Sequence, residues 1–167
     1  MQLQRCRSFA VPATRLFQVL TSKPFFDARH AMSGASQYRY DAFGPTERGL
    51  LVRIIRELDL SARPLPGFAR RFVGESAALT MEFLWTHTQA PPYRAELRCS
   101  IGRVPVQVHG HMTIADEGGE ALQTLALTID SSVPLVGSKL AAIVAAQLDK
   151  GLQSDYRATL AYLQANP

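Results

Sequence analysis

Alternation of apolar and polar residues through the middle of this chain constrains its fold more than any other feature. Within residues 78–87, every second side chain from Leu79 to Trp85 is apolar, and two of the three side chains between them, Thr80 and Glu82, are polar. The same period recurs in residues 93–101, 106–114 and 121–129. Successive side chains of a strand point to opposite faces, so these four segments are predicted to be strands that share one buried face.

Turn residues at regular intervals predict that the strands form an antiparallel meander. Asp-Glu-Gly-Gly at 116–119 separates the last two strands, and Gly44-Pro45 and Gly49 separate two earlier candidates, residues 37–43 and 50–60. Such residues favour tight turns, and six strands fit between residues 35 and 130. In residues 50–60 the buried face stays open, because two apolar sets compete for it. The sets are Val52, Ile54 and Leu58 on one face and Leu51 and Ile55 on the other.

Helical patterns flank the meander on both sides. Apolar residues recur at every fourth position from Leu140 to Leu160, which predicts an amphipathic helix capped by Ser138 and continuing to about Leu163. Before the meander, residues 3–10 are predicted as a strand, and two short helices follow, the second ending at Gly34. The last helix is long for so small a domain, so we expect the sheet to curve along it.

Length and composition favour one domain spanning residues 1–167. The hydrophobic fraction of 47% and the charged fraction of 19% are typical of a globular chain. The predicted fold is therefore α+β, with a curved seven-stranded antiparallel sheet around a long C-terminal helix and two short helices after the first strand.

Several functional classes lack support in the sequence. The N-terminus has no apolar signal region, and no segment approaches the roughly 20 apolar residues needed to span a bilayer, so a cytoplasmic location is expected. Cys6 and Cys99 are far apart in sequence and show no metal-ligand spacing, which indicates reduced thiols. The net charge of +4 comes with arginines spread singly along the chain, so no nucleic-acid partner is predicted.

Catalytic and metal-binding motifs are also missing. The sequence contains no G-x-S-x-G elbow, no phosphate-binding loop and no pair of carboxylates on the predicted inner face, so no catalytic residue and no cofactor are predicted. His109 and His111 share one strand face with Gln107 and Thr113. That face is the polar one, so no metal site is predicted there.

Several motifs resemble those of a known superfamily. Val11-Pro12-Ala13-Thr14-x-Leu16-Phe17 is similar to the opening of the START-like (SRPBCC, helix-grip) superfamily, which also has this order of strands and helices. Three further motifs look like one bacterial family within it, called domain of unknown function 2505. They are Leu65-Pro66-x-Phe68-x-Arg70-x-Phe72-x-Gly74, Pro105-Val106-x-Val108-x-Gly110 and Val133-Pro134-Leu135-Val136-Gly137. The resemblance implies a helix-grip fold with a cavity between sheet and helix, and it implies no particular reaction.

The candidate ligand-binding residues lie on the predicted inner faces of the strands and the last helix. They are Met81, Phe83, Trp85, His87, Tyr93, Leu97, Cys99, Val108, Met112, Leu127, Val144 and Leu148. An apolar cavity with a few polar groups is the usual composition of a ligand site. Trp85, His87 and Tyr93 would supply polar groups, joined by Tyr38, Tyr40 and Arg56 from the far edge of the sheet. In the alternative interpretation, Trp85 and Tyr93 only fill the core, with their ring polar atoms bonded to backbone.

The segment 65–74 interrupts the meander and permits two interpretations. It is amphipathic and basic if helical, and Phe68 and Phe72 would then share one face. It is predicted to be either a short helix that plugs one end of the sheet or a gate whose lip makes transient contact with a membrane.

These observations leave three functions to be separated. The leading hypothesis is binding or carrying of a lipid or other hydrophobic small molecule in the cavity. The alternative is a cyclase- or hydrolase-type enzyme acting on a polyketide-like or aromatic ligand, with His87 or Tyr93 as general acid or base. A third is an interaction protein whose cavity is filled by its own side chains. The oligomeric state stays open.

Overall fold

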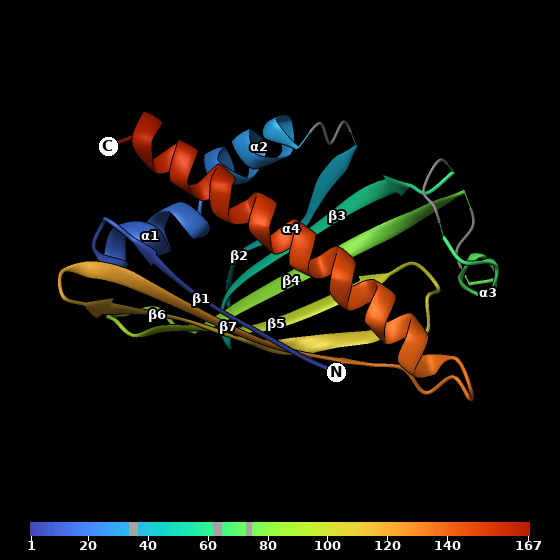
Figure 1. The fold of residues 1–167 in the computed structure, drawn as a ribbon. Helices are drawn as coiled ribbons and strands as arrows, with labels where there is room; N and C mark the ends of the chain where they lie inside the picture. The colour runs from blue at the N-terminus through green and yellow to red at the C-terminus, as the bar shows by residue number, and fades with distance from the viewer. Residues whose placement is uncertain (34–36, 62–64, 73–74) are drawn as a thin grey trace.

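One antiparallel sheet of seven strands and a long helix across it make up most of the molecule. The computed structural model describes residues 1–33, 37–61, 65–72 and 75–167. The elements are β1 (Gln2–Phe9), α1 (Ala13–Leu20), α2 (Lys23–Met32), β2 (Tyr38–Thr46), β3 (Gly49–Asp59), α3 (Gly67–Arg70), β4 (Ser76–His87), β5 (Tyr93–Ile101), β6 (Gln107–Glu117), β7 (Glu120–Asp130) and α4 (Gly137–Ala165). Figure 1 shows α4 running diagonally across one face of the curved sheet, with α1 and α2 beside its C-terminal half. The predicted α+β helix-grip fold is confirmed.

The strand order is β1-β7-β6-β5-β4-β3-β2. The six later strands pair in chain order, as a meander does, whereas β1 pairs with β7 at the other end of the chain, with Arg5 opposite Leu125. Because β1 and β2 lie on opposite edges of the sheet, α1 and α2 must carry the chain from one edge to the other. This crossing places α2 next to α4.

Pairing with β4 decides the buried face of β3, which the sequence left open. Val52 lies opposite Phe83 and Ile54 opposite Met81, and both β3 side chains are fully buried. Opposed residues of paired strands share a face. The set of Val52, Ile54 and Leu58 is therefore the inner one, and Arg56 is carried to the inner face with it.

Close approach of two backbones explains the glycine at position 110. Gly110 lies opposite Leu127 in the β6–β7 pair, and a Cβ built on it would overlap the carbonyl oxygen of Ala126. No residue with a side chain fits there without a shift of the backbone. Gly110 therefore permits the tight packing of β6 on β7 within the curved sheet.

Local details of three turns and caps differ from the sequence predictions. Gly44 and Pro45 lie within β2, which reaches Thr46, because a proline is tolerated on an edge strand that needs no inward N–H. The α4 helix begins at Gly137 with Val136 as its N-cap residue, so the predicted cap at Ser138 is wrong. Gly34, the predicted end of α2, lies outside the described residues.

A long-range contact begins α1. The Asp116 carboxylate, at the end of β6, accepts a 2.7 Å hydrogen bond from the backbone N–H of Ala13. Since the first N–H groups of a helix have no partner within it, a carboxylate at this position stabilises the helix start. The contact ties α1 to the β6–β7 hairpin.

Candidate functional site

A cavity of about 680 Å³ lies between the sheet and α4. This volume is in the range of small-molecule sites in proteins. Ten of the predicted ligand-binding residues line it: Met81, Phe83, Trp85, Leu97, Cys99, Val108, Met112, Leu127, Val144 and Leu148. Their shared inner face follows from the period of two in β4 to β7 and the period of four in α4. Their role in binding a ligand stays a prediction.

Aromatic contacts join the C-terminal half of α4 to α2 and β1. Phe25 of α2 packs edge-on against Tyr162, with ring centroids 5.4 Å apart, and Phe9 of β1 packs edge-on against Tyr156 at 5.2 Å. Edge-on ring pairs of this kind are favourable, so they help to fix this half of α4 relative to α2 and the edge strand.

His87 does not reach the cavity. A register shift in the β4–β5 pair falls between Trp85 and His87, and both Thr86 and His87 are exposed. Without this bulge, strict alternation from Trp85 would have placed His87 on the inner face. The prediction that His87 points inward is therefore wrong.

Tyr93 is buried but packs in the wall behind the cavity. Its ring stacks on Phe17 with centroids 4.1 Å apart, and its hydroxyl lies 3.0 Å from the hydroxyl of Thr14. It is not among the residues that line the cavity. Trp85 does line it, and its indole N–H has no hydrogen-bond partner among the described residues. Tyr93 thus fills the core, as the alternative interpretation predicted. The backbone bonds that it also predicted are wrong, because the Tyr93 hydroxyl pairs with the Thr14 side chain and the Trp85 N–H has no described partner.

The two cysteines occupy different environments. Cys99 lies on the cavity wall, and burial raises the pKa of its thiol to about 11. At neutral pH the thiol is protonated and a poor nucleophile. Cys6 is exposed on the other face of the sheet.

Arginines on the cavity wall were missed by the sequence analysis. The inner face of β1 carries Arg5 and Arg7 between Leu3 and Phe9, and both arginines line the cavity. Counting every second residue back along the strand from the buried Phe9 would have placed both arginines on the inner face. Arg29 of α2 also lines the cavity, although only 8% of its surface is exposed.

Two of these arginines pair with carboxylates of α4. The Nε of Arg5 donates to Asp149 at 2.9 Å, and Arg29 donates to Asp155 at 3.2 Å. Arg29 also lies over the ring of Phe26, 4.9 Å from its centroid. These contacts attach α4 to β1 on one side and to α2 on the other.

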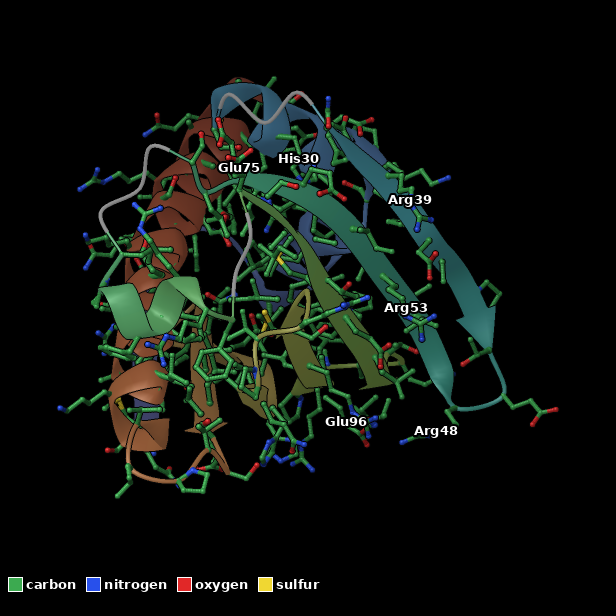
Figure 2. All side chains as sticks on the ribbon, turned by 90° about the vertical axis from the view of Figure 1, so that its right-hand side faces the viewer. His30, Arg39, Arg48, Arg53, Glu75 and Glu96 are labelled. Carbon is green, nitrogen blue, oxygen red and sulfur yellow. The ribbon has the colours of Figure 1, made fainter. Side chains whose placement is uncertain are left out.

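His30 is a buried titratable group at the α2 end of the cavity. Its ring is 1% exposed and stacks on Tyr38 with centroids 3.8 Å apart. Burial, followed by the charges of Arg29 and Arg56, lowers the pKa of His30 to about 4. The ring is therefore neutral at pH 7. Figure 2 shows His30, which belongs to α2, at the opposite end of the sheet from Arg48 and Glu96.

Two tyrosines hold α2 against the edge strand instead of facing the cavity. The hydroxyls of Tyr38 and Tyr40 both donate to Asp27, at 2.9 and 2.6 Å. These bonds, that of Tyr40 first, lower the pKa of Asp27 below its usual value. Of the three polar groups predicted at this edge, only Arg56 lines the cavity.

The α3 segment covers one end of the sheet. Phe68 and Phe72 are half-buried and pack against the core cluster, and neither lines the 680 Å³ cavity. Arg70 and Arg71 are exposed. This packing favours the plug over the gate, and the gate stays a prediction. Val73 and Gly74, the end of the predicted segment, lie outside the described residues.

The polar face of the sheet carries the remaining histidines. His109 and His111 are exposed on β6. Within the described residues, no three His, Cys, Asp or Glu side chains are grouped so that they could hold a metal ion. None of the helices in the described ranges meets the combined requirement of length and hydropathy for crossing a lipid bilayer.

Several solved structures share this arrangement of sheet and helices. The match to Ara h 8.0201 covers 99% of both chains, with 13% identity and a TM-score of 0.65. The match to TTHA0849 from Thermus thermophilus covers 100% of both chains, with 12% identity and a TM-score of 0.63. A protein from Rhodobacter sphaeroides is 18% identical over 99% of this chain and 93% of its own, with a TM-score of 0.60. The fold is therefore the START-like, helix-grip fold.

The family is narrower than the superfamily. Residues 6–163 match the family described as "Protein of unknown function (DUF2505)", and the chain belongs to that family. No curated protein matches the chain. The resemblance predicted from the sequence motifs is therefore confirmed, and the family itself carries no assigned activity.

Proposed function

We propose that this protein binds or carries a lipid or other hydrophobic small molecule between the sheet and α4. The observation that carries the proposal is the 680 Å³ cavity, whose wall is built by apolar side chains from four consecutive strands and from α4. Superfamily membership supports the same conclusion.

Burial of apolar surface would supply the affinity. A buried methylene group contributes about 0.8 kcal/mol, so a chain of about eight methylenes gains about 6 kcal/mol before the cost of immobilising the ligand. The wall offers the matching surface, because Leu97, Leu127 and Val144 are buried among other apolar side chains. Chain-like or flat apolar molecules therefore suit this site.

The enzyme alternative has lost its two candidate groups. It relied on His87 or Tyr93 as general acid or base, and neither lines the cavity. Cys99, which does line it, carries a protonated thiol at neutral pH. Binding without a reaction is thus the better supported function.

A cavity-filling variant tests the proposal. The probe is N-phenyl-1-naphthylamine, an uncharged dye that fluoresces in apolar surroundings. The wild type should bind it saturably, and Cys99→Trp should weaken binding at least about tenfold, or about 1.4 kcal/mol, because the indole occupies the cavity. Ser100→Trp is the matched control, since Ser100 is the next residue of β5 and is exposed on the other face.

Two results would contradict the proposal. One is a wild type that does not bind the dye, and the other is a folded Cys99→Trp variant that binds it as tightly as the wild type does. Native mass spectrometry of protein purified from its own host would then identify any molecule that co-purifies.

A further inference from the structure

Positive charge gathers at the α2 end of the cavity. Arg7 of β1, Arg29 of α2 and Arg56 of β3 all line it there. Glu82 and Asp155 are the acidic residues in its lining among the described residues, and the Glu82 carboxylate points to the opposite face of β4, because Met81 and Phe83 on either side of it face inward. Glu82 is held by Arg53 at 2.7 Å, and Asp155 already pairs with Arg29. The cavity wall therefore carries more positive than negative charge.

Of the two β1 arginines that line the cavity, Arg7 is the one without a paired carboxylate. Its guanidinium forms neither a hydrogen bond nor an ion pair with any described residue, and its only close contact of note is the ring of Tyr156, 4.9 Å from the guanidinium carbon. Arg5, two residues earlier on the same face, is paired with Asp149. A guanidinium has five N–H donors, and none of those of Arg7 is used by a described residue, so they are available to a ligand.

The charged groups around Arg7 and His30 affect the pKa values of both side chains. Burial first, with Arg5 adding to it, lowers the pKa of Arg7 despite the opposing effect of Asp155 and Asp149. The groups that face Arg7 are Arg5 on its own strand and Asp149, Asp155 and Tyr156 on α4. Around His30, Arg29 and Arg56 outweigh Asp27. The two carboxylates near Arg7 are already paired, Asp149 with Arg5 and Asp155 with Arg29, so Arg7 has no carboxylate of its own.

We infer that the ligand of this cavity is an amphipathic carboxylic acid whose carboxylate binds Arg7, with its apolar body lying along the strands beneath α4. The inference rests on the proposed function and names the chemistry of its ligand. The planar fork of an arginine matches the two oxygens of a carboxylate, and a hydrogen bond between two charged groups is stronger than one between neutral groups. Arg29 and Arg56 add favourable potential without having to touch the head group.

The two ends of the cavity would then bind different parts of the ligand. The apolar wall at Leu97, Leu127 and Leu148 gives affinity for the hydrocarbon part in proportion to its buried area. The charged end selects acids over the corresponding esters and alcohols, because a neutral head group leaves Arg7 without a partner.

A pair of probes that differ only in charge tests the inference. These are cis-parinaric acid, a fluorescent fatty acid, and its methyl ester, each titrated at pH 7.5. The wild type should bind the acid at least about tenfold more tightly than the ester, equivalent to about 1.4 kcal/mol. Arg7→Gln should lose most of this preference, because it should bind the acid more weakly and the ester with unchanged affinity.

Arg94→Gln is the matched control. It removes the same charge from an exposed position on the other face of β5, so binding of both probes should stay as in the wild type. An equal loss in Arg94→Gln would show that net charge, and not Arg7, determines the preference, and would overturn the inference.

The outcomes separate this inference from the proposed function. Equal binding of acid and ester by the wild type refutes the carboxylate site while the apolar ligand site stands. Binding of neither probe refutes both. If Arg7→Gln does not fold by circular dichroism, the wild-type ratio of acid to ester and the charge-retaining Arg7→Lys variant decide the question, because Arg7→Lys should keep part of the preference.

Discussion

Replacement of His30 by phenylalanine should remove a defined part of the pH dependence of stability. The His30 ring is 1% exposed and stacks on Tyr38, and its pKa is lowered to about 4 in the folded chain from the ordinary 6.5. Between these values the unfolded chain binds more protons than the folded one, so the free energy of unfolding rises with pH. Stability is therefore fully present above about pH 6.5 and is lost as the pH falls toward 4.

The magnitude follows from the two pKa values. The full shift from 6.5 to about 4 corresponds to about 3 kcal/mol, and at pH 5 the loss relative to pH 7.5 is about 2 kcal/mol. Phenylalanine keeps a stacking ring of similar size and cannot take up a proton. The His30→Phe variant should lack this contribution and keep only the pH dependence of the other titrating groups.

Urea unfolding followed by circular dichroism, at several pH values between 8 and 5, measures the difference. The wild type should lose about 2 kcal/mol more than His30→Phe between pH 7.5 and pH 5. His87→Phe, at an exposed position on β4, should retain the wild-type dependence. Parallel curves for the wild type and His30→Phe would refute the argument that the buried ring resists protonation.

Four further substitutions test the packing described above, each by its urea midpoint. Gly110→Ala should lower the free energy of unfolding by about 2 kcal/mol or more, because the new methyl overlaps the backbone of β7. Gly151→Ala is the contrasting change in α4, where an added Cβ has no neighbour within 4 Å outside the helix backbone, and it should stabilise the protein by up to about 1 kcal/mol. Destabilisation in both would contradict the account of the β6–β7 contact. Leu135→Gly should stabilise by about 1 kcal/mol, because Leu135 is 98% exposed and held at a φ of 66°; a loss of stability would mean that the side chain has a partner. Phe68→Ala should cost about 1–2 kcal/mol, less than a fully buried ring, and leave the kinetics of dye binding unchanged; faster binding or release at unchanged stability would favour a gate.

The spacing of apolar residues and the turn residues within short segments determined most of the fold. Alternation from Leu79 to Trp85 predicts a strand with those residues inside, and β4 and its neighbours have that orientation. The spacing of Leu140, Val144 and Leu148 predicts the α4 face toward the sheet in the same way. Such signals are local, because the side-chain directions of a strand or helix depend only on its own backbone.

Contacts between distant segments decided what the local patterns left open. Val52 and Leu51 are equally apolar, and only the register of β3 on β4 selects the inner one. The bulge after Trp85 depends on pairing with β5, and it removed His87 from the candidate site.

The site itself depended on tertiary structure in a further way. A polar residue on a strand pattern, such as Arg7, is expected on the solvent face unless the register of the whole strand is counted from Phe9. Whether Arg7 then finds a carboxylate depends on which turn of α4 crosses β1, and Asp149 pairs with Arg5 instead. The position of α4 over the sheet likewise involves contacts with distant segments, because Phe25 of α2 and Phe9 of β1 pack against its tyrosines. The sequence by itself therefore determined the inner faces of β4 to β7 and of α4, except at His87. Only the tertiary structure decided the inner face of β3, the space between sheet and helix and the uncompensated charge on its wall, because these depend on contacts between elements far apart in the chain.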